Sequence, residues 1–174
     1  MMKLNLGCGS DIKKGYVNLD SVKLSGVDVV HDLDKIPYPF KANTFGEVYA
    51  RHVLEHVTDL VATLEELLRI TKPGGKIVVI CPYFSNPGAF SDPTHKRFFT
   101  YNTFDYFTVG SGLSYYSKVR VCIISRRIRL FGSLRLLRVL GFVPELLINL
   151  VPVLYQRFFA YVLPAAEIEF VLKK

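Results

Sequence analysis

The stretch KLNLGCGSDIKKGYVNLDSV, residues 3–22, places two short apolar runs on either side of a bare glycine turn. The first run ends at Gly7-Cys8-Gly9 and the second at Asp20. Short apolar runs closed by turn residues are typical of buried strands. Glycine lacks a Cβ and adopts positive φ without strain, so the backbone here can approach a ligand closely. A carboxylate at the end of the next strand suits a ribose diol, because it can accept hydrogen bonds from two hydroxyls.

Strand and helix signals continue to alternate through the first half of the chain. Apolar runs at 27–33, 44–51 and 76–84 predict strands. Leucines recur at helical spacing over 59–75, where Asp59 is a candidate N-cap and Lys-Pro-Gly-Gly ends the pattern. Strands that alternate with helices predict an α/β fold with a mostly parallel sheet and helices on its faces.

The second half has a different texture. Residues 84–117 are rich in proline, glycine and aromatic side chains, and they indicate a loop on the substrate side of the sheet. Further strands are expected at 118–131 and 165–174. Between them, the apolar segment 132–164 indicates two or three short helices broken at Pro144, Pro152 and Pro164. We expect a single domain over residues 1–174, with 3–83 as its ligand-binding half.

The net charge of +7 lies in one part of the chain. Residues 1–105 carry 12 Lys+Arg and 12 Asp+Glu, whereas residues 106–174 carry 10 and 3, and 10 − 3 = +7. Seven of these cations fall in Lys118–Arg138. Nucleic acid is a disfavoured partner, because the aromatic segment 83–107 holds few cations and no base-reading motif occurs.

The cysteines and the first residues of the chain indicate the cellular compartment. Cys8, Cys81 and Cys122 are odd in number and widely spaced, which favours reduced thiols in a cytoplasmic protein over disulfides or a metal site. We expect no signal peptide, because the first strand begins near Lys3.

The glycine turn leaves two nucleotide-type alternatives open. A dinucleotide fold requires G-x-G-x-x-G with a helix N-terminus at the pyrophosphate. Here Ile12 stands where the third glycine belongs, and the segment 10–14 is short for the usual first helix. A nicotinamide oxidoreductase is therefore disfavoured, while a site for another nucleoside remains.

Four stretches, in order, carry a family resemblance: LNLGCG, NLD, HDLDKIPYPFKANTFGEVYARHVLEHVTD and LEELLRITKPGGKIVVICP, within residues 3–83. Together they resemble the class I S-adenosylmethionine-dependent methyltransferases, in the small-molecule, type 11-like group. The resemblance implies a Rossmann-like fold, a mostly parallel sheet with an antiparallel last strand, helices on both faces, and S-adenosylmethionine as cofactor. The chain departs from the family pattern at Asn5 and Gly46, where acids are common.

The resemblance also implies roles for individual residues. The glycine turn would pass under the methionine part of the cofactor, and Asp20 would hold the ribose hydroxyls. Asp32 would bind the adenine amino group. The cofactor residues implied by position are Asn5, Gly7, Cys8, Gly9, Asp20, Asp32, Leu33, Arg51 and His52. The side chains of His52 and His56 are interpreted as structural rather than catalytic.

The acceptor side is expected in SDPTHKRFFTYNTFDYF, residues 91–107, over the carboxyl ends of the strands. His95 is the candidate base, because imidazole titrates near neutral pH, and Asp92 could orient it. Tyr83, Arg97 and Tyr101 are candidate acceptor-binding residues. The alternative is a loop held by its own aromatic side chains with His95 on the surface. We expect no metal.

Residues 132–164 leave three alternatives: a cover over the substrate, a homodimer interface, or contact with an anionic membrane surface. The segment is too interrupted to span a bilayer. The function expected is O-methylation of a small-molecule, glycan or lipid-linked acceptor, in the cytoplasm or at the inner face of the membrane. The rival is a non-catalytic scaffold with the same fold, membrane-associated or dimeric.

Overall fold

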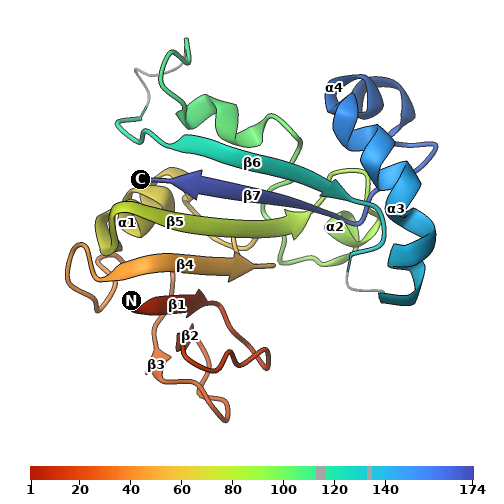
Figure 1. Ribbon diagram of the computed structural model, residues 1–174. Helices are drawn as coiled ribbons and strands as arrows, with labels where there is room; N and C mark the ends of the chain where they lie inside the picture. The colour runs from red at the N-terminus through yellow and green to blue at the C-terminus, as the bar shows by residue number, and fades with distance from the viewer. Residues whose placement is uncertain (113–116, 133–134) are drawn as a thin grey trace.

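The computed structural model describes residues 1–112, 117–132 and 135–174, with the backbone alone for 135–141. A seven-stranded sheet in the order β3-β2-β1-β4-β5-β7-β6 forms its centre (Figure 1). The strands are β1 Lys3–Leu6, β2 Val17–Asp20, β3 Val29–Val30, β4 Phe45–Arg51, β5 Thr71–Pro82, β6 Cys122–Arg129 and β7 Glu167–Lys173. Strand β7 is antiparallel to both of its neighbours, and the other pairs are parallel. The predicted α/β fold class is confirmed, including the antiparallel last strand.

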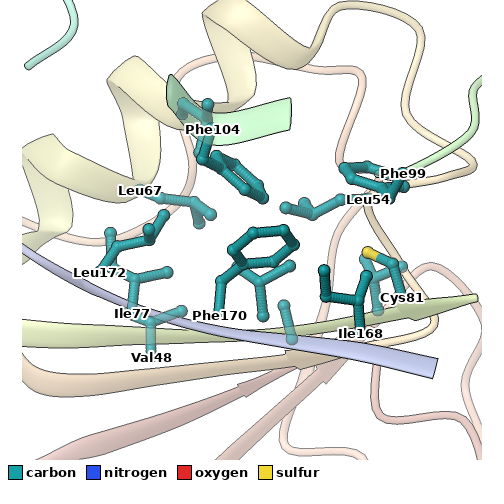
Figure 2. Close-up of a cluster of buried hydrophobic side chains, with 14 of the residues drawn as sticks. Val48, Leu54, Leu67, Ile77, Cys81, Phe99, Phe104, Ile168, Phe170 and Leu172 are labelled. Atoms are coloured by element: carbon teal, nitrogen blue, oxygen red, sulfur yellow. The ribbon is translucent and has the colours of Figure 1, made fainter. Parts of the chain in front are cut away.

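One face of the sheet carries the hydrophobic core (Figure 2). Side chains alternate between the faces of a strand, so Val48, Ile77 and Phe170 point to the same side. Helix α1 (Leu60–Ile70) and the 3₁₀ helix η1 (Thr103–Phe107) cover this face with buried leucine and phenylalanine side chains. Segments far apart in sequence therefore share one core.

Helix α1 begins and ends as predicted. The Asp59 side chain accepts a hydrogen bond from the Ala62 amide at 3.0 Å, which confirms the N-cap. The helix stops at Ile70, just before the Lys-Pro-Gly-Gly stretch that was predicted to end it. Pro73 disfavours helical backbone in the residue before it, and Gly74 has φ +74, so the chain turns into β5 instead.

Among the described residues, helix α3 (Arg135–Leu150) is the helix that contacts the other face, along the β6 edge (Figure 1). Arg127 on this face lies 3.4 Å from the Glu145 carboxylate of α3. The predicted helices on both faces are thus present. Much of the remaining surface of this face is charged, as in the Lys3–Glu47 pair at 3.6 Å.

Helix α3 continues through Pro144, where the sequence predicted a break, so that prediction is wrong. Proline removes one backbone donor from the helix. Its neighbours compensate, because Glu145 and Asn149, one turn apart, both bind β6. The Glu145 carboxylate accepts from the Leu130 amide at 3.1 Å. The Asn149 side chain both accepts from the Ile128 amide and donates to the Ile128 carbonyl, each at 2.8 Å.

The remainder of the apolar segment follows the prediction more closely. Helix α4 (Pro152–Leu154) begins at Pro152, and the π-helical turn η2 (Tyr155–Phe159) ends before Pro164. A short helix, α2 (Gly88–Ser91), lies in the substrate-side loop. No helix among the described residues combines the length and hydropathy needed to cross a bilayer. Positions 113–116 and 133–134, and the side chains of Arg135 and Arg138, lie outside what the structure describes.

The Asn149 contact yields a first prediction. Asn149→Ala would leave the amide and carbonyl of Ile128 without their side-chain partner at the sheet edge. We expect the free energy of unfolding to fall by about 1–3 kcal/mol in urea titrations. Leu147→Ala, an exposed position on the same helix, is the control and should change stability by less than about 0.5 kcal/mol. Equal losses in the two variants would contradict the edge-binding role of Asn149.

Candidate functional site

The glycine turn after β1 is held against the end of β2. Gly7 and Gly9 have φ of +59 and +49, in the left-handed region that favours glycine. A Cβ on Gly7 would lie 2.5 Å from the Val53 side chain, so no larger residue fits. The Gly9 amide donates to the Asp20 carboxylate at 2.7 Å, and the Cys8 amide donates to the Leu19 carbonyl at 2.9 Å.

Asn5 supports this turn from below. It is buried, and its side-chain amide donates to the Asp11 carbonyl at 2.7 Å and to the Asn18 side chain at 2.9 Å. Asn5 therefore stabilises the loop that follows the turn rather than facing a ligand. Cys8 is also buried, and burial is the main cause that raises the pKa of its thiol.

A cavity of about 260 Å³ opens beside the turn. It lies at the carboxyl ends of the parallel strands, where open α/β sheets bind ligands. Three carboxylates, those of Asp20, Asp32 and Asp34, face it and give it an acidic wall. The lining residues are Gly7, Asp20, Ser21, Asp32, Leu33, Asp34, His52, Val53, His56 and Val57.

Five of the predicted cofactor residues line this cavity: Gly7, Asp20, Asp32, Leu33 and His52. Asn5, Cys8 and Gly9 support it from the turn. Arg51 does not line it, because its guanidinium donates to the Glu167 carboxylate at 2.7 Å on another part of the sheet. The resemblance implied that Arg51 acts mostly through its backbone, and the partner of its side chain is a separate finding of the structure.

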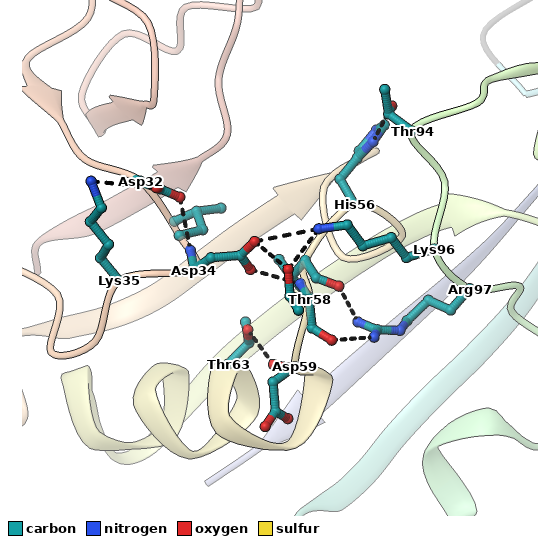
Figure 3. Close-up of polar contacts among 12 residues, drawn as sticks. Asp32, Asp34, Lys35, His56, Thr58, Asp59, Thr63, Thr94, Lys96 and Arg97 are labelled. Carbon is teal, nitrogen blue, oxygen red and sulfur yellow. Dashed lines mark hydrogen bonds and ion pairs between the residues drawn. The ribbon is translucent and has the colours of Figure 1, made fainter.

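One carboxylate of the acidic wall, that of Asp34, is held by hydrogen bonds to the loop between β4 and α1 (Figure 3). The Asp34 carboxylate accepts from the Thr58 amide at 2.7 Å and also from the Thr58 hydroxyl. Hydrogen bonding by the Thr58 hydroxyl, followed by its amide, lowers the pKa of Asp34. The Lys96 ammonium donates to the Thr58 hydroxyl at 2.7 Å. Asp34 therefore stays ionised while it holds the cavity rim.

His52 lies between two buried carboxylates at the end of β4. It has φ +54, its Nε2 is 2.9 Å from Glu167 and its Nδ1 is 3.4 Å from Glu55. The hydrogen bond to Glu167, followed by the longer 3.4 Å contact with Glu55, raises the pKa of His52 to about 9. Burial alone would raise the pKa of Glu167, but hydrogen bonds from His52 and Arg51 lower it to about 2. At neutral pH the group holds an imidazolium beside the cavity.

Glu167→Gln tests this network. We expect a loss of about 1–3 kcal/mol in the free energy of unfolding at neutral pH, because Arg51 and His52 lose a buried anionic partner. A carboxyl whose pKa is lowered by folding stabilises the protein above its unfolded pKa, near 4.5, and less as the pH falls toward about 2. The difference between wild type and variant should therefore shrink over that acid range in urea titrations. A difference that stays constant from neutral pH to about pH 2 would contradict this assignment.

Two histidines meet at the acceptor side of the cavity. The rings of His56 and His95 are 4.7 Å apart, edge to face. His56 lines the cavity, whereas His95 is mostly buried behind it. The His95 Nδ1 is 2.7 Å from the Ala89 carbonyl, and its Nε2 is 3.7 Å from Asp92. The Ala89 carbonyl, rather than Asp92, therefore orients the imidazole.

The other predicted acceptor residues support the loop. Tyr83 is fully buried, and its hydroxyl donates to Gln156 at 3.2 Å. Arg97 donates to the carbonyls of Val57 and Thr58 at 2.5 and 2.9 Å (Figure 3). The Tyr101 ring packs under the Arg126 guanidinium. These contacts leave the three side chains engaged with the protein itself, which does not fit a direct role in binding an acceptor.

Sequence reasoning missed several cavity residues. Asp34, Val53, His56 and Val57 all line the cavity, and none of them was assigned to the ligand. A signal was present, because all follow strands β3 or β4 and the carboxyl ends of parallel strands meet at one edge. His56, interpreted as structural, is the histidine of the pair that faces the cavity.

The described part of the apolar segment, residue 132 and residues 142–164, does not line this cavity. It packs on Tyr83, just before the substrate-side loop, and on Tyr101 within that loop instead. Gln156 accepts from the Tyr101 amide at 2.8 Å, and Tyr155 stacks on Tyr83. A cover over the cofactor cavity therefore has no support in this arrangement.

The fold and the cavity define a class of protein. Residues 4–79 match the family model described as a methyltransferase domain. The mostly parallel sheet with the antiparallel β7 is that of the Rossmann-like S-adenosylmethionine-dependent methyltransferase fold. The resemblance seen in residues 3–83 is thus confirmed.

Particular proteins show the same likeness. A demethylmenaquinone methyltransferase from Bacillus mycoides (strain KBAB4) is 34% identical over 73 residues, which are 42% of this chain and 30% of that protein. A solved SAM-dependent methyltransferase from Archaeoglobus fulgidus aligns with 99% of this chain and 86% of its own, at 17% identity and a TM-score of 0.63. One from Mesorhizobium loti covers 99% and 90%, at 14% identity and a TM-score of 0.56. At these identities the structural likeness establishes the fold.

Proposed function

We propose that this protein is an S-adenosylmethionine-dependent methyltransferase whose cofactor binds in the 260 Å³ cavity at the carboxyl ends of β1, β2 and β4. The observation that carries the proposal is the joint position of the glycine turn and Asp20. The backbone of Gly7 leaves no room for a Cβ, and Asp20 follows the neighbouring strand and faces the same cavity. The match of residues 4–79 to a methyltransferase domain supports it.

The residues present fit this cofactor. Its sulfonium is cationic, and the cavity wall holds three carboxylates. Asp20 uses its oxygens to accept from the Gly9 and Val22 amides, and each oxygen keeps a lone pair for a ribose hydroxyl. Asp32, half-exposed with Leu33 beside it, would bind the adenine amino group. The His52 imidazolium would attract the cofactor's carboxylate.

Methyl transfer does not require the protein to form a covalent bond with either reactant. The bound cofactor supplies an activated methyl group, and the chain supplies orientation and exclusion of water. A base is required where the acceptor is a hydroxyl. We retain His95 as that base. The Ala89 carbonyl fixes its proton on Nδ1 and leaves the Nε2 lone pair free, and Asp92 at 3.7 Å would stabilise the imidazolium that forms. The ring of His56, which lines the cavity, is 4.7 Å from that of His95.

Calorimetric titration with S-adenosylmethionine, S-adenosylhomocysteine and NAD tests the cofactor assignment. We expect both adenosyl ligands to bind and NAD not to bind. Asp20→Ala should weaken binding by about 10- to 100-fold, because each charged hydrogen bond contributes about 1.5–3 kcal/mol. Asp11→Ala removes an exposed carboxylate near the same loop and is the matched control. Absence of adenosyl binding in wild type would favour the non-catalytic scaffold.

The acceptor class follows from a second surface. Thirteen large apolar side chains between residues 142 and 163 are exposed, and we call them the apolar face. They are Phe142, Val143, Leu146, Leu147, Leu150, Val151, Val153, Leu154, Phe158, Phe159, Tyr161, Val162 and Leu163. They lie on α3, α4 and the chain that follows, at the end of the sheet toward which the parallel strands point (Figure 1).

We assign an anionic bilayer surface to the apolar face. A protein interface carries polar groups at its rim and hydrogen bonds across it. Here the polar side chains turn inward: Asn149 binds β6, Gln156 binds Tyr101 and the Tyr155 hydroxyl donates to the Leu163 carbonyl at 2.6 Å. The exposed charge among the described side chains of 142–163 is the cation of Arg157. The hydrocarbon of a bilayer offers no hydrogen-bonding groups, so a face without polar side chains suits it. A basic residue near anionic lipid contributes about 1 kcal/mol to membrane binding.

A membrane surface favours a lipid-linked or otherwise membrane-borne acceptor over a freely diffusing small molecule or glycan. The curated relative is named for demethylmenaquinone, and that name belongs to the relative. For this chain we propose O-methylation of a membrane-borne acceptor. Residues 3–83 would bind the cofactor, 84–117 would lie over the acceptor, and 132–164 would contact the bilayer.

The absence of tryptophan from the chain allows a direct test. In Phe158→Trp we expect the emission to shift to shorter wavelengths with vesicles of phosphatidylcholine and phosphatidylglycerol, because the indole enters a dry environment. Val30→Trp, at an exposed position on β3, is the control and should not shift. Val153→Asp should weaken co-sedimentation with these vesicles by about tenfold or more.

Light scattering without vesicles tests the alternative, in which the apolar face binds a second copy of the chain. A stable dimer in solution that Val153→Asp dissociates, with no vesicle binding by wild type, would contradict the bilayer assignment and support a homodimer interface. Binding that persists equally on phosphatidylcholine alone would contradict the role of charge.

A further inference from the structure

We propose that Glu55, His56 and His95 form a site for a divalent transition metal ion of the zinc type, at the acceptor side of the cavity. One potential ligand atom from each residue lies within 4.8 Å of those of the other two. The three side chains come from two separate segments, the loop after β4 and the substrate-side loop, which meet here. The sequence predicted no metal because His95 is far from Glu55 and His56 in the chain, and only the fold brings the three residues together.

The hydrogen bonds of the two histidines fix their tautomers. The Ala89 carbonyl can only accept, so the His95 Nδ1 at 2.7 Å carries the proton. The Thr94 hydroxyl donates to the Asp92 carboxylate at 2.6 Å, so it accepts from the His56 Nδ1 at 2.9 Å. Both neutral imidazoles therefore present an Nε2 lone pair. Metal-binding histidines characteristically donate their other ring N–H to a carbonyl, carboxylate or water in this way.

The third member is a buried carboxylate in need of a partner. Glu55 is 1% exposed, and neither of its carboxylate oxygens accepts a hydrogen bond in the described part of the chain. Its charged neighbour is His52, whose Nδ1 lies 3.4 Å from Oε1. The Cys81 thiol is also close, but a thiol is a weak donor. A buried anion left in this state favours a cation, and Oε2 has no charged neighbour of its own among the ion pairs of the described residues.

The donor set indicates the class of ion. Two imidazole nitrogens and one carboxylate oxygen suit zinc and related transition metals, whereas calcium and magnesium prefer oxygen ligands throughout. Zinc holds such ligands at about 2.0–2.2 Å, so the side chains must close on the ion. The half-exposed His56 side chain, at the cavity wall, is the one with room to move.

Three protein ligands leave a fourth position open, as in catalytic zinc sites. That position lies on the cavity side, because His56 lines the cavity. A metal ion there would bind an acceptor oxygen and lower the pKa of its hydroxyl. This role at the acceptor rests on the proposed function, but metal binding itself does not. With the ion bound, the His95 Nε2 is a ligand and no longer a base, so the metal ion takes over the activation of the acceptor hydroxyl, and the base role proposed for His95 holds for the metal-free protein.

The test is titration of the chelator-treated full chain with Zn²⁺ and with Co²⁺, without S-adenosylmethionine. We expect one equivalent to bind, and the visible spectrum of the Co²⁺ form to indicate nitrogen and oxygen ligands. His56→Gln and His95→Gln should each weaken binding by about tenfold or more. His31→Gln is the matched control, because His31 lies outside the cluster and its Nε2 is 2.8 Å from the Lys35 carbonyl.

Each outcome decides the proposal. No binding by wild type overturns it, and so does binding that His56→Gln and His95→Gln leave unchanged, since the ion would then sit elsewhere. Circular dichroism establishes that each variant is folded. Glu55→Gln alters a buried group, so the histidine variants and the wild-type titration carry the decision. A chain that binds metal but not S-adenosylmethionine retains the metal site and loses the proposed function.

Discussion

The structure depends on a left-handed turn with no room for a side chain. At Gly7 the backbone takes a positive φ directly against Val53, so the end of β1 and the loop after β4 lie in van der Waals contact. Two residues on, the Gly9 amide binds the carboxylate that ends β2. These contacts bring the ends of three strands to one place. The cavity lies at this place, and the residues that follow β3 complete its wall.

The acceptor side is attached to the same place by a second set of contacts. Lys96 and Arg97 bind the backbone and side chains of the β4–α1 loop, and the Lys96 amide donates to the Glu55 carbonyl at 2.8 Å. The loop that would hold the acceptor and the loop that lines the cofactor cavity thus form one hydrogen-bonded unit. Such mutual support reduces the freedom of either half, which is what methyl transfer between two bound molecules requires.

The predictable parts of this protein are those in which neighbours in sequence decide the outcome. The strands, the cap at Asp59 and the glycine turn follow from local patterns, and the order of the motifs gave the cavity. Arg51, Tyr83 and Arg97 were assigned to ligands, yet their partners are Glu167, Gln156 and the β4–α1 loop, which are far away in sequence. Helix α3 passes through Pro144 because Glu145 and Asn149 reach β6, and that contact is equally invisible in a local pattern.

The side-chain amide of Asn149 helps to fix the orientation of helix α3 relative to the sheet. Its two hydrogen bonds to Ile128 occupy a place on the edge strand that a further strand would otherwise take. A helix attached in this way cannot swivel independently of the sheet. The apolar face therefore keeps a fixed angle to the parallel strands, whatever surface it binds. The orientation of the cavity mouth toward that surface therefore depends on the contacts of Asn149 and Glu145 at the far edge of the sheet.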